Sequence, residues 1–529
     1  AIVSLKSVAT DFPINGQIQL EFDKNIAWQD SYKANITIIP TTTSTAIDFN
    51  VSYNNKVLTI TPTDNLKYNT KYTVSVAGIE NVCDNNMTFT TVALTVSSKI
   101  SSQASDISEV NGVDRLVLQP TFTIDYGKKI LNQTVAKSNI KLNDNALPNS
   151  STLVFDEAGK IATLTFTADL NVFTDYTLSL NEFADDDNAT ISAQTLSFKT
   201  VPPEDITGEG TLSSPYLIYT QAHLNKLRED AYLQTGKYFK QMDNIVMTGN
   251  WTPIGSNSNK FYGFYDGNNL KITGLTIQTN NNYAGLFSAI GSDNKSKIEN
   301  LKLENVNING AEYVGALAGY INKADITNVH VIGEVNIESS GQIVGGLTGE
   351  CDKTQITRCS VDSPNGLINV GNSGSNIGGL IGLAYNGAEN NSISESYASI
   401  TVQGNSNVGG LVGYMYKYSI VNSYSDSSLI VIGSNPTSIG GLIGEMYDSC
   451  SFNNCYAKVA YGSGAVSYGN CLVGYIQEDA QHPFGGDSKN NFAWRAELPI
   501  GSTKILYKFG DGISPEDGKD STRNNYFSN

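Results

Sequence analysis

A short glycine and leucine motif recurs seven times in the second half of this chain at nearly constant spacing. Its central leucines lie 31, 30, 33, 31, 31 and 30 residues apart. The copies are Gly285-Leu286, Gly315-Ala316-Leu317-Ala318-Gly319, Gly345-Gly346-Leu347-Thr348-Gly349, Gly378-Gly379-Leu380-Ile381-Gly382, Gly409-Gly410-Leu411-Val412-Gly413, Gly440-Gly441-Leu442-Ile443-Gly444 and Cys471-Leu472-Val473-Gly474. A period this steady is typical of repeat proteins, whose units bury their apolar faces against their neighbours. The sequence therefore predicts a stack of equivalent units.

The segments between these motifs favour strands over helices. An apolar residue follows each central leucine, after nine residues at Ile326, Ile356 and Ile420, and the flanking sequence is rich in Val, Ile, Ser, Thr and Tyr. These residues have high β propensity. A propeller blade needs about 40–45 residues, more than one unit supplies. We therefore favour a parallel β-solenoid over a seven-bladed propeller.

The recurring glycines have two structural roles open to them. One is a corner with positive φ, and the other is a place where two backbones pass too close for a Cβ. The residues concerned are Gly315, Gly345, Gly346, Gly378, Gly379, Gly409, Gly410, Gly440 and Gly441.

Two further columns are expected along the stack. Asparagines stand two residues beyond the apolar position, and such residues can form a hydrogen-bonded ladder; they are Asn300, Asn328, Asn422 and Asn454. Two residues further on, Tyr397, Tyr424 and Tyr456 should lie above one another in consecutive coils. Aromatic rows can stack on sugar rings or on a partner protein, although the same tyrosines can instead fill the interior or cover the sheet.

A second aromatic patch is expected on one loop. Tyr414, Tyr416 and Tyr418 alternate there with other residues. With the tyrosine column, Tyr414 and Tyr416 complete the candidate ligand-binding residues.

The first 200 residues consist of two modules of about 100 residues with the same ordered features. Tyr72-Thr73-Val74 corresponds to Tyr176-Thr177-Leu178, and Phe89-Thr90-Thr91 corresponds to Phe198-Lys199-Thr200. Short alternating strands in modules of this length predict Ig-like sandwiches, and the tyrosines suggest tyrosine corners. The prolines of the segment 201–205 suit a stiff linker.

We therefore predict an all-β chain of four parts. These are Ig-like sandwiches at 1–97 and 98–203, a β-solenoid of about seven 30–33-residue repeats at 204–476 with an N-terminal capping helix, and a C-terminal cap or partial repeat at 477–529.

Composition excludes several partners. The formal charge is −17, and only 16% of the 529 residues are charged. An acidic chain without a basic patch is a poor ligand for nucleic acid or anionic lipid. No apolar run approaches the roughly 20 residues of a membrane helix. Because the chain begins at Ala1, we expect that an export signal has been removed, which places the protein outside the cell or on its surface.

Sequence motifs predict no catalytic residue, cofactor or metal site. The three histidines, His223, His330 and His482, fall in no His-Glu-x-x-His motif, and we expect them to be structural or solvent-facing. The acidic loop 185–187, with Glu182 and Asn188, offers oxygen ligands for Ca²⁺. Its spacing matches no calcium motif, so a solvated turn is favoured.

The six cysteines do not suggest a disulfide framework. Cys359 and Cys455 should occupy the same site three coils apart, roughly 14 Å at about 4.8 Å per coil, which is beyond disulfide reach. Cys351, Cys450 and Cys471 could find partners only through suitable loop conformations. We expect mostly buried free thiols.

The Gly-Gly-Leu-x-Gly units resemble the GLUG repeats of large bacterial surface and secreted proteins, including some immunoglobulin A-specific metalloproteases. The lead-in is similar, with Ser214-Pro215-Tyr216-Leu217-Ile218-Tyr219, Trp251-Thr252-Pro253-Ile254-Gly255 and Phe264-Tyr265-Asp266-Gly267. The first module resembles bacterial Ig-like domains through Leu58-Thr59-Ile60-Thr61-Pro62 and the segment 66–74. This resemblance implies an adhesin-like surface protein, and the habit of the family is a lipid anchor, here upstream of residue 1. We therefore expect attachment to the outer membrane.

Three functions remain open. The first is a non-enzymatic adhesin in which an Ig-like stalk presents a solenoid that binds a host or matrix protein or a glycan. The second is a carbohydrate-active β-helix enzyme, a polysaccharide lyase or hydrolase, and the third is a structural spacer or assembly subunit. Because carboxylates do not recur in register among the repeat positions, we favour a non-enzymatic role.

Overall fold

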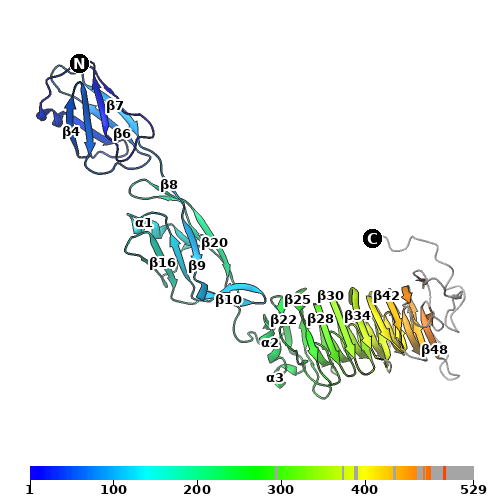
Figure 1. Cartoon of the computed structure of the whole chain (residues 1–529). Helices are drawn as coiled ribbons and strands as arrows, with labels where there is room; N and C mark the ends of the chain where they lie inside the picture. Colours follow the sequence, from blue (N-terminus) through cyan, green and yellow to red (C-terminus); the bar gives the residue numbers. More distant parts are fainter. Residues whose placement is uncertain are drawn as a thin grey trace. The chain divides into compact units, whose positions relative to one another are not determined.

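The computed structural model describes residues 1–529 except 292–295, 372–373, 387–390, 433–436, 462–468, 471, 478–491 and 496–529. The chain forms two compact units, Ala1–Pro202 and Pro203–Asn529 (Figure 1). The predicted all-β class is confirmed, with 6% helix. Cys471, His482 and most of the predicted cap at 477–529 lie outside the described residues.

The first module of the N-terminal unit is a sandwich of two antiparallel sheets. One sheet contains β1 (Val3–Leu5), β2 (Ile18–Phe22), β5 (Val57–Pro62) and β4 (Phe49–Asn54), and the other contains β3 (Ile36–Pro40), β6 (Lys71–Val76) and β7 (Asn85–Thr90). The 3-10 helix η1 (Asp30–Asn35) precedes β3. Alternate residues point inward, as at Ile18, Leu20 and Phe22 of β2, because successive side chains of a strand face opposite sides.

The second module repeats this architecture. Its two four-stranded sheets contain β15 (Ser151–Phe155), β16 (Ile161–Phe166), β12 (Thr121–Asp125) and β9 (Lys99–Ser102), and β14 (Asn145–Ala146), β13 (Ile140–Leu142), β17 (Asp175–Leu180) and β20 (Gln194–Lys199). Smaller elements are β18 (Phe183–Ala184), β19 (Thr190–Ile191), β8 (Thr95–Val96), β10 (Ile107–Val110), β11 (Val113–Leu116), η2 (Ala104–Asp106) and α1 (Gln133–Ser138).

Both modules contain the predicted tyrosine corner. The Tyr72 hydroxyl accepts a hydrogen bond of 2.9 Å from the Lys67 amide, and the Tyr176 hydroxyl accepts one of 3.0 Å from the Asn171 amide. The carbonyl of the same upstream residue accepts a 2.6 Å bond from a threonine in each module, Thr91 or Thr200. The two corners thus use the same hydrogen bonds, although the second is degenerate in sequence.

The C-terminal unit is a parallel β-solenoid of about seven turns, as predicted. Its seventeen-stranded sheet contains β21 (Tyr216–Ile218), β22 (Tyr238–Gln241), β23 (Ile245–Val246), β24 (Phe264–Asp266), β25 (Lys271–Thr273), β26 (Thr276–Gln278), β28 (Ser296–Gly310), β30 (Ala324–Ser339), β33 (Gln355–Thr357), β34 (Ser360–Val370), β37 (Ser392–Ser394), β38 (Tyr397–Gly404), β41 (Ser419–Val421), β42 (Tyr424–Val431), β45 (Ser451–Asn453), β46 (Tyr456–Tyr461) and β49 (Phe492–Arg495). Figure 1 shows these strands stacked coil on coil.

Two further sheets complete the coils. The seven-stranded sheet contains β27 (Phe287–Ile290), β29 (Ala318–Asn322), β32 (Thr348–Asp352), β36 (Ile381–Tyr385), β40 (Val412–Tyr416), β44 (Ile443–Tyr447) and β48 (Val473–Gln477). The five-stranded sheet contains β31 (Val344–Gly345), β35 (Ser375–Gly378), β39 (Ser406–Gly409), β43 (Thr437–Gly440) and β47 (Gly469–Asn470). The predicted capping helix is two short helices, α2 (Gln221–Lys226) and α3 (Asp230–Leu233).

The apolar register of the sequence forms the core of the solenoid. Its members pair in parallel from coil to coil and are fully buried: Ile298, Ile326, Ile356, Ile393, Ile420 and Phe452. Burying a side chain of this size stabilises the fold by about 1.5–3 kcal/mol, which only the stack makes available.

The asparagine column forms a corner at which the backbone is left-handed. The φ angles lie between 51° and 56° at Asn300, Asn328, Arg358, Glu395, Asn422 and Asn454. Asparagine tolerates this conformation better than most residues. Asn328 donates to the Asn300 side chain at 2.9 Å and Asn454 to that of Asn422 at 3.0 Å. The predicted ladder is therefore present in two segments.

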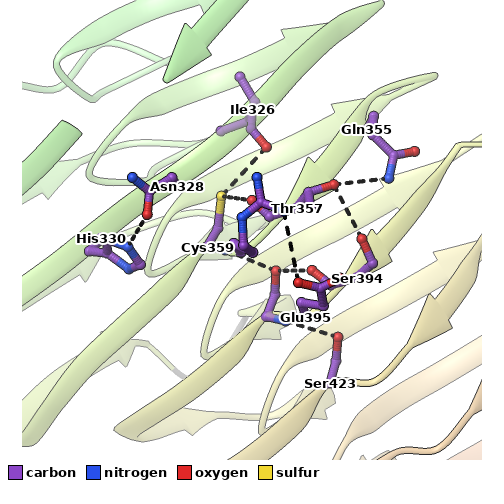
Figure 2. Close-up of polar contacts among 11 residues, drawn as sticks. Ile326, Asn328, His330, Gln355, Thr357, Cys359, Ser394, Glu395 and Ser423 are labelled. Atoms are coloured by element: carbon purple, nitrogen blue, oxygen red, sulfur yellow. Dashed lines mark hydrogen bonds and ion pairs between the residues drawn. The ribbon is translucent and has the colours of Figure 1, made fainter. Parts of the chain in front are cut away.

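Hydroxyl and thiol side chains connect the coils beside this corner (Figure 2). Thr357 and Ser394 lie 3.2 Å apart, and the Ser396 hydroxyl accepts from the Cys359 amide at 3.0 Å. The Cys359 thiol donates to the Ile326 carbonyl at 3.6 Å. Within the described chain the free cysteines are Cys351, Cys359, Cys450 and Cys455, which are buried, and Cys83, which is exposed.

The doubled glycines serve close backbone approach. None has a positive φ. A Cβ at Gly378 would lie 2.7 Å from the amide nitrogen of Gly413 in the next coil, and one at Gly345 would lie 2.7 Å from that of Gly382. These distances are shorter than any ordinary carbon contact, so the five-stranded and seven-stranded sheets can approach only where side chains are absent.

Tyr418 bridges the coil that carries the sequence insertion. Its ring is buried, its hydroxyl accepts from the Thr354 amide at 2.8 Å, and it donates to the Thr354 carbonyl. Thr354 lies 64 residues earlier in the chain, and the coil between departs from the regular repeat after Tyr385. The phenol thus satisfies two backbone groups that would otherwise be buried without partners.

We predict that Gly378→Ala destabilises the solenoid by about 3 kcal/mol or more, because the added Cβ meets backbone that cannot move without displacing the next coil. Urea unfolding of the full chain followed by circular dichroism measures the effect. Gly371→Ala is the matched control, since a Cβ there meets nothing within 4 Å. Equal stability of the two variants would contradict the close-approach interpretation.

We also predict that Tyr418→Phe lowers the free energy of unfolding by about 1–3 kcal/mol, because the Thr354 amide and carbonyl lose their partner. Tyr424→Phe removes a hydroxyl from a ring that is 37% exposed and should change stability by less than about 0.5 kcal/mol. The same denaturation experiment compares the two, and similar losses would argue against a bridging role for Tyr418.

Candidate functional site

The predicted tyrosine column lies on the outer face of the seventeen-stranded sheet. Tyr397, Tyr424 and Tyr456 pair in register on β38, β42 and β46. The rings of Tyr397 and Tyr424 are stacked, with centroids 4.8 Å apart and planes 2° apart. The neighbouring Ala398 is buried, so strand alternation directs the tyrosines outward.

Stacking limits what this column can offer a ligand. Because the rings of Tyr397 and Tyr424 are stacked, each covers one face of the other. The Tyr397 hydroxyl already donates to Asp362 at 3.2 Å. Below it, Ser360 is only 1% exposed and lies 2.8 Å from the His330 ring nitrogen. Ligand binding by this column therefore stays a prediction.

Two of the histidines have structural partners. The His330 ring bonds to Ser360 through Nδ1 at 2.8 Å. It bonds to Asn328 through Nε2 at 2.9 Å (Figure 2). The buried His223 accepts from the Tyr219 amide at Nδ1, and burial lowers its pKa. Both rings are thus engaged within the fold.

The predicted second patch is not on a loop. Tyr414 and Tyr416 belong to strand β40 of the seven-stranded sheet, a different face from that of Tyr397. Tyr418 does not join them, because Lys417 adopts a left-handed conformation with φ of 51° and the chain turns inward after it. The loop assignment was therefore wrong, and only the two strand residues face outward.

Tyr414 and Tyr416 belong to two parallel rows, which we call the tyrosine–carboxylate face. The first row, in register along the sheet, is Tyr320, Glu350, Leu383, Tyr414, Glu445 and Tyr475. The second row is Asn322, Asp352, Tyr385, Tyr416 and Tyr447. Carboxylates do recur in register, so the expectation that they do not was wrong: Glu350 and Glu445 share one position. Each glutamate lies three residues after the central leucine of its repeat, and this common spacing could have predicted the shared position from the sequence.

Tyrosines of the second row form a continuous stack. Ring centroids lie 4.9 Å apart between Tyr385 and Tyr416 and 5.6 Å apart between Tyr416 and Tyr447. Tyr385 is 43% exposed, and Tyr475 of the first row is 50% exposed. Burial raises the pKa of Tyr414 to about 12. Aromatic surface from four consecutive coils is therefore gathered on one side of the solenoid.

Glu350 is the most perturbed acid of this face. Burial, with a smaller contribution from Asp352, raises its pKa to about 7. Within the described residues, its carboxylate has no hydrogen bond or ion pair. Asp352 accepts from Asn322 at 2.7 Å through Oδ2, whereas its buried Oδ1 has no hydrogen-bond partner. Unpartnered carboxylate oxygens at partly buried positions are uncommon in native proteins.

Strained tyrosines adjoin these acids. Tyr283 and Tyr313 have φ angles of 66° and 58°, although bulky residues rarely adopt the left-handed conformation. Their rings are stacked with centroids 4.7 Å apart, and the ring centroid of Tyr320 lies 6.4 Å from that of Tyr283. The same left-handed position recurs in the following coils at Ile343, Asn376, Asn407 and Ser438, so this corner belongs to the repeat, and the two tyrosines each bear a cost of about 1–3 kcal/mol there.

The acidic loop of the N-terminal unit is neither a solvated turn nor an open oxygen cage. Asp185 is 2% exposed and lies 2.7 Å from the Lys128 ammonium, which also contacts Asp187 at 2.9 Å. Its carboxylate further accepts from the Leu131 and Asn132 amides. These bonds hold the pKa of Asp185 below its usual value despite burial. The favoured solvated turn was wrong because Lys128 lies across the loop.

The described residues contain no group of three or more histidine, cysteine or acidic side chains that could hold a metal ion. Among the helices of the described segments, none is long and apolar enough to cross a membrane.

Two regions of the chain match known protein families. Residues 3–97 match the bacterial Ig-like domain, which identifies the first module. Residues 259–333 match the N-terminal region of the M26 IgA1-specific metallo-endopeptidases.

Individual proteins resemble parts of the chain. A protein of Evansella cellulosilytica, provisionally named a Gly-rich membrane protein, is 34% identical over 33% of this chain and 20% of its own length. The immunoglobulin A1 protease of Streptococcus sanguinis is 33% identical over 28% of this chain and 7% of its own length. The chain thus spans a fifth or less of these relatives.

A solved structure also aligns with the chain. It is a protein of Bacteroides ovatus provisionally named an immunoglobulin A1 protease, with 18% identity, a TM-score of 0.36, and coverage of 50% of this chain and 83% of its own.

We predict that Glu350→Gln stabilises the solenoid above pH 7 and not near pH 4.5. The folded pKa of about 7 exceeds the ordinary 4.5, so the unfolded chain loses its proton first and stability falls as pH rises between these values. The variant escapes this loss, which amounts to at most about 3 kcal/mol. Urea denaturation at several pH values, with the exposed Glu338→Gln as control, measures it. A gain independent of pH would contradict this interpretation.

Proposed function

We propose that this chain is a non-enzymatic, adhesin-like protein of the cell surface, in which Ig-like modules carry a ligand-binding β-solenoid. The observation that carries the proposal is the tyrosine–carboxylate face. It gathers tyrosines from consecutive coils on one rigid sheet, and exposed aromatic residues of this kind are enriched in binding surfaces. A rigid stack also holds such side chains at fixed spacing without the entropic cost of ordering a loop.

The surface location rests on two sources of support. The Gly-Gly-Leu-x-Gly units resemble GLUG repeats of bacterial surface and secreted proteins, and one relative has a name that places it in a membrane. Attachment to an outer membrane through a lipid upstream of residue 1 belongs to the same proposal. Its ligand would be a host or matrix protein or a glycan.

A non-enzymatic role is favoured over the activities that the comparisons suggest. The match to metallo-endopeptidases covers residues 259–333, and no His-Glu-x-x-His motif occurs anywhere in the sequence. The carbohydrate-enzyme alternative gains one argument from Glu350, because a carboxyl with a pKa near 7 can act as a general acid. A binding assay must therefore also record products.

We predict that the full chain retains ligands from a panel of matrix proteins and glycans without releasing products, and that Tyr416→Ala weakens retention about tenfold or more, since aromatic hot spots lose this much on truncation. Surface plasmon resonance and chromatography of the supernatant measure the two quantities. Tyr424→Ala is the matched variant, because it removes a tyrosine of the predicted column on the seventeen-stranded sheet.

If Tyr424→Ala weakens ligand retention and Tyr416→Ala does not, the ligand binds to the column of Tyr397, Tyr424 and Tyr456 instead. Cleavage of a panel member that is lost in Glu350→Gln would favour the carbohydrate enzyme. Retention of no panel member would favour the spacer.

A further inference from the structure

Among the described residues of the solenoid, Glu350 is a partly buried acid whose carboxylate has no hydrogen bond or ion pair, whereas other such acids are bonded. Glu304 is bonded to Lys271 and Thr273, and Glu445 accepts from Ser438 at 3.1 Å. Asp448 pairs with Lys417 at 3.2 Å. The fold thus supplies donors to acids elsewhere but not to the Glu350 carboxylate or to Oδ1 of Asp352.

We propose that Glu350 and Asp352, with the tyrosines around them, receive an arginine side chain from a partner polypeptide. This inference rests on the proposed function and names the class of ligand. The two acids lie two residues apart on β32, so they project from the same side of the sheet. Together they present carboxylate oxygens only, and the matching ligand must be rich in N–H donors.

Arginine fits this set better than other ligands. Its planar guanidinium has five donors, bonds carboxylates in pairs and stacks on aromatic rings. Tyr313 and Tyr320 flank the acid and could contact the guanidinium or its alkyl chain. A neutral sugar needs open ring faces, whereas Tyr283 and Tyr313 cover each other at 4.7 Å. An anionic sugar would be repelled by both acids.

Cations of the chain itself already occupy this face. The Lys260 ammonium lies 5.8 Å from the Tyr320 ring centroid, and the Lys417 ammonium lies 5.1 Å from that of Tyr416. Both contacts have the geometry of a cation–π interaction. The net charge of −17 would also steer a basic partner toward the chain.

Binding of the guanidinium should depend on pH, because Glu350 must lose its proton to pair with it. The charged and titratable groups around Glu350 come from its own strand, the preceding coils and the corners: Tyr283, Glu312, Tyr313, Tyr320, Lys323, Asp352 and Lys353. The lysines are near Asp352, and no cation is paired with Glu350 in the described chain. An incoming cation would therefore favour the ionised form of Glu350 and release its proton.

Isothermal titration of the full chain with a capped peptide of alternating glycine and arginine tests the inference. We expect binding that strengthens between about pH 6 and pH 8, with proton release at the lower pH. Glu350→Gln should weaken it about tenfold or more and remove the pH dependence. Glu338→Gln, which removes the same charge from the seventeen-stranded sheet, should leave affinity unchanged, and the neutral citrulline peptide should not bind.

Equal affinities of the wild type and Glu350→Gln, or of the arginine and citrulline peptides, would overturn the inference. A neutral oligosaccharide that binds in a Tyr416-dependent manner, when the arginine peptide does not, would overturn it and leave the proposed function standing. Failure of every ligand in both assays would overturn both. Because glutamine is isosteric with glutamate and relieves an unfavourable charge, loss of folding in Glu350→Gln is not expected.

Discussion

The close approach of the five-stranded and seven-stranded sheets is the constraint on which the solenoid depends. Backbone atoms of consecutive coils lie where a Cβ at Gly345 or Gly378 would stand, so glycine is required by space and not by φ. This contact fixes the turn between the two sheets in the coils that contain these glycines. It also fixes the register of the seven-stranded sheet, because a slip by one residue would bring a side chain into the gap and reverse every strand face. The rows of tyrosines and acids are therefore consequences of where the glycines lie.

Within that frame, the outer positions are free to vary, and their variation gives the solenoid its surface chemistry. The position of Tyr414 is a tyrosine in some coils, glutamate in others and leucine in one, although the backbone at each is the same. Because coils are about 4.8 Å apart, a row of aromatic residues stacks ring on ring, as Tyr385, Tyr416 and Tyr447 do. A row that mixes types does not. The mixed first row instead places carboxylates and aromatic rings at neighbouring positions of one sheet.

The sequence predicted the fold class well because its signals were periodic and redundant. The leucine spacing, the apolar register and the tyrosine corners at Tyr72 and Tyr176 each depend on local residues with few alternative structures. The candidate site was predicted less well, because the corners between strands determine whether a side chain points into the core or outward. The left-handed backbone at Lys417 turns the Tyr418 side chain inward, whereas Tyr416 points outward. A lysine does not predict this backbone conformation. Glu350 was not predicted because its raised pKa arises from burial within the stacked coils, which the residue type alone does not indicate.

The same arrangement explains why an unfavourable carboxyl can persist at this position. Cross-coil pairing holds β32 between β29 and β36, so the backbone cannot retreat to expose Glu350 without breaking ladders on both sides. The stack therefore stabilises a side chain that, taken alone, favours the unfolded chain above its folded pKa. A packed repeat array can sustain this local cost because each coil is supported by two neighbours. Unsatisfied carboxylate oxygens then remain available for a partner to bind, and a binding surface gains affinity from groups that the fold itself leaves unsatisfied.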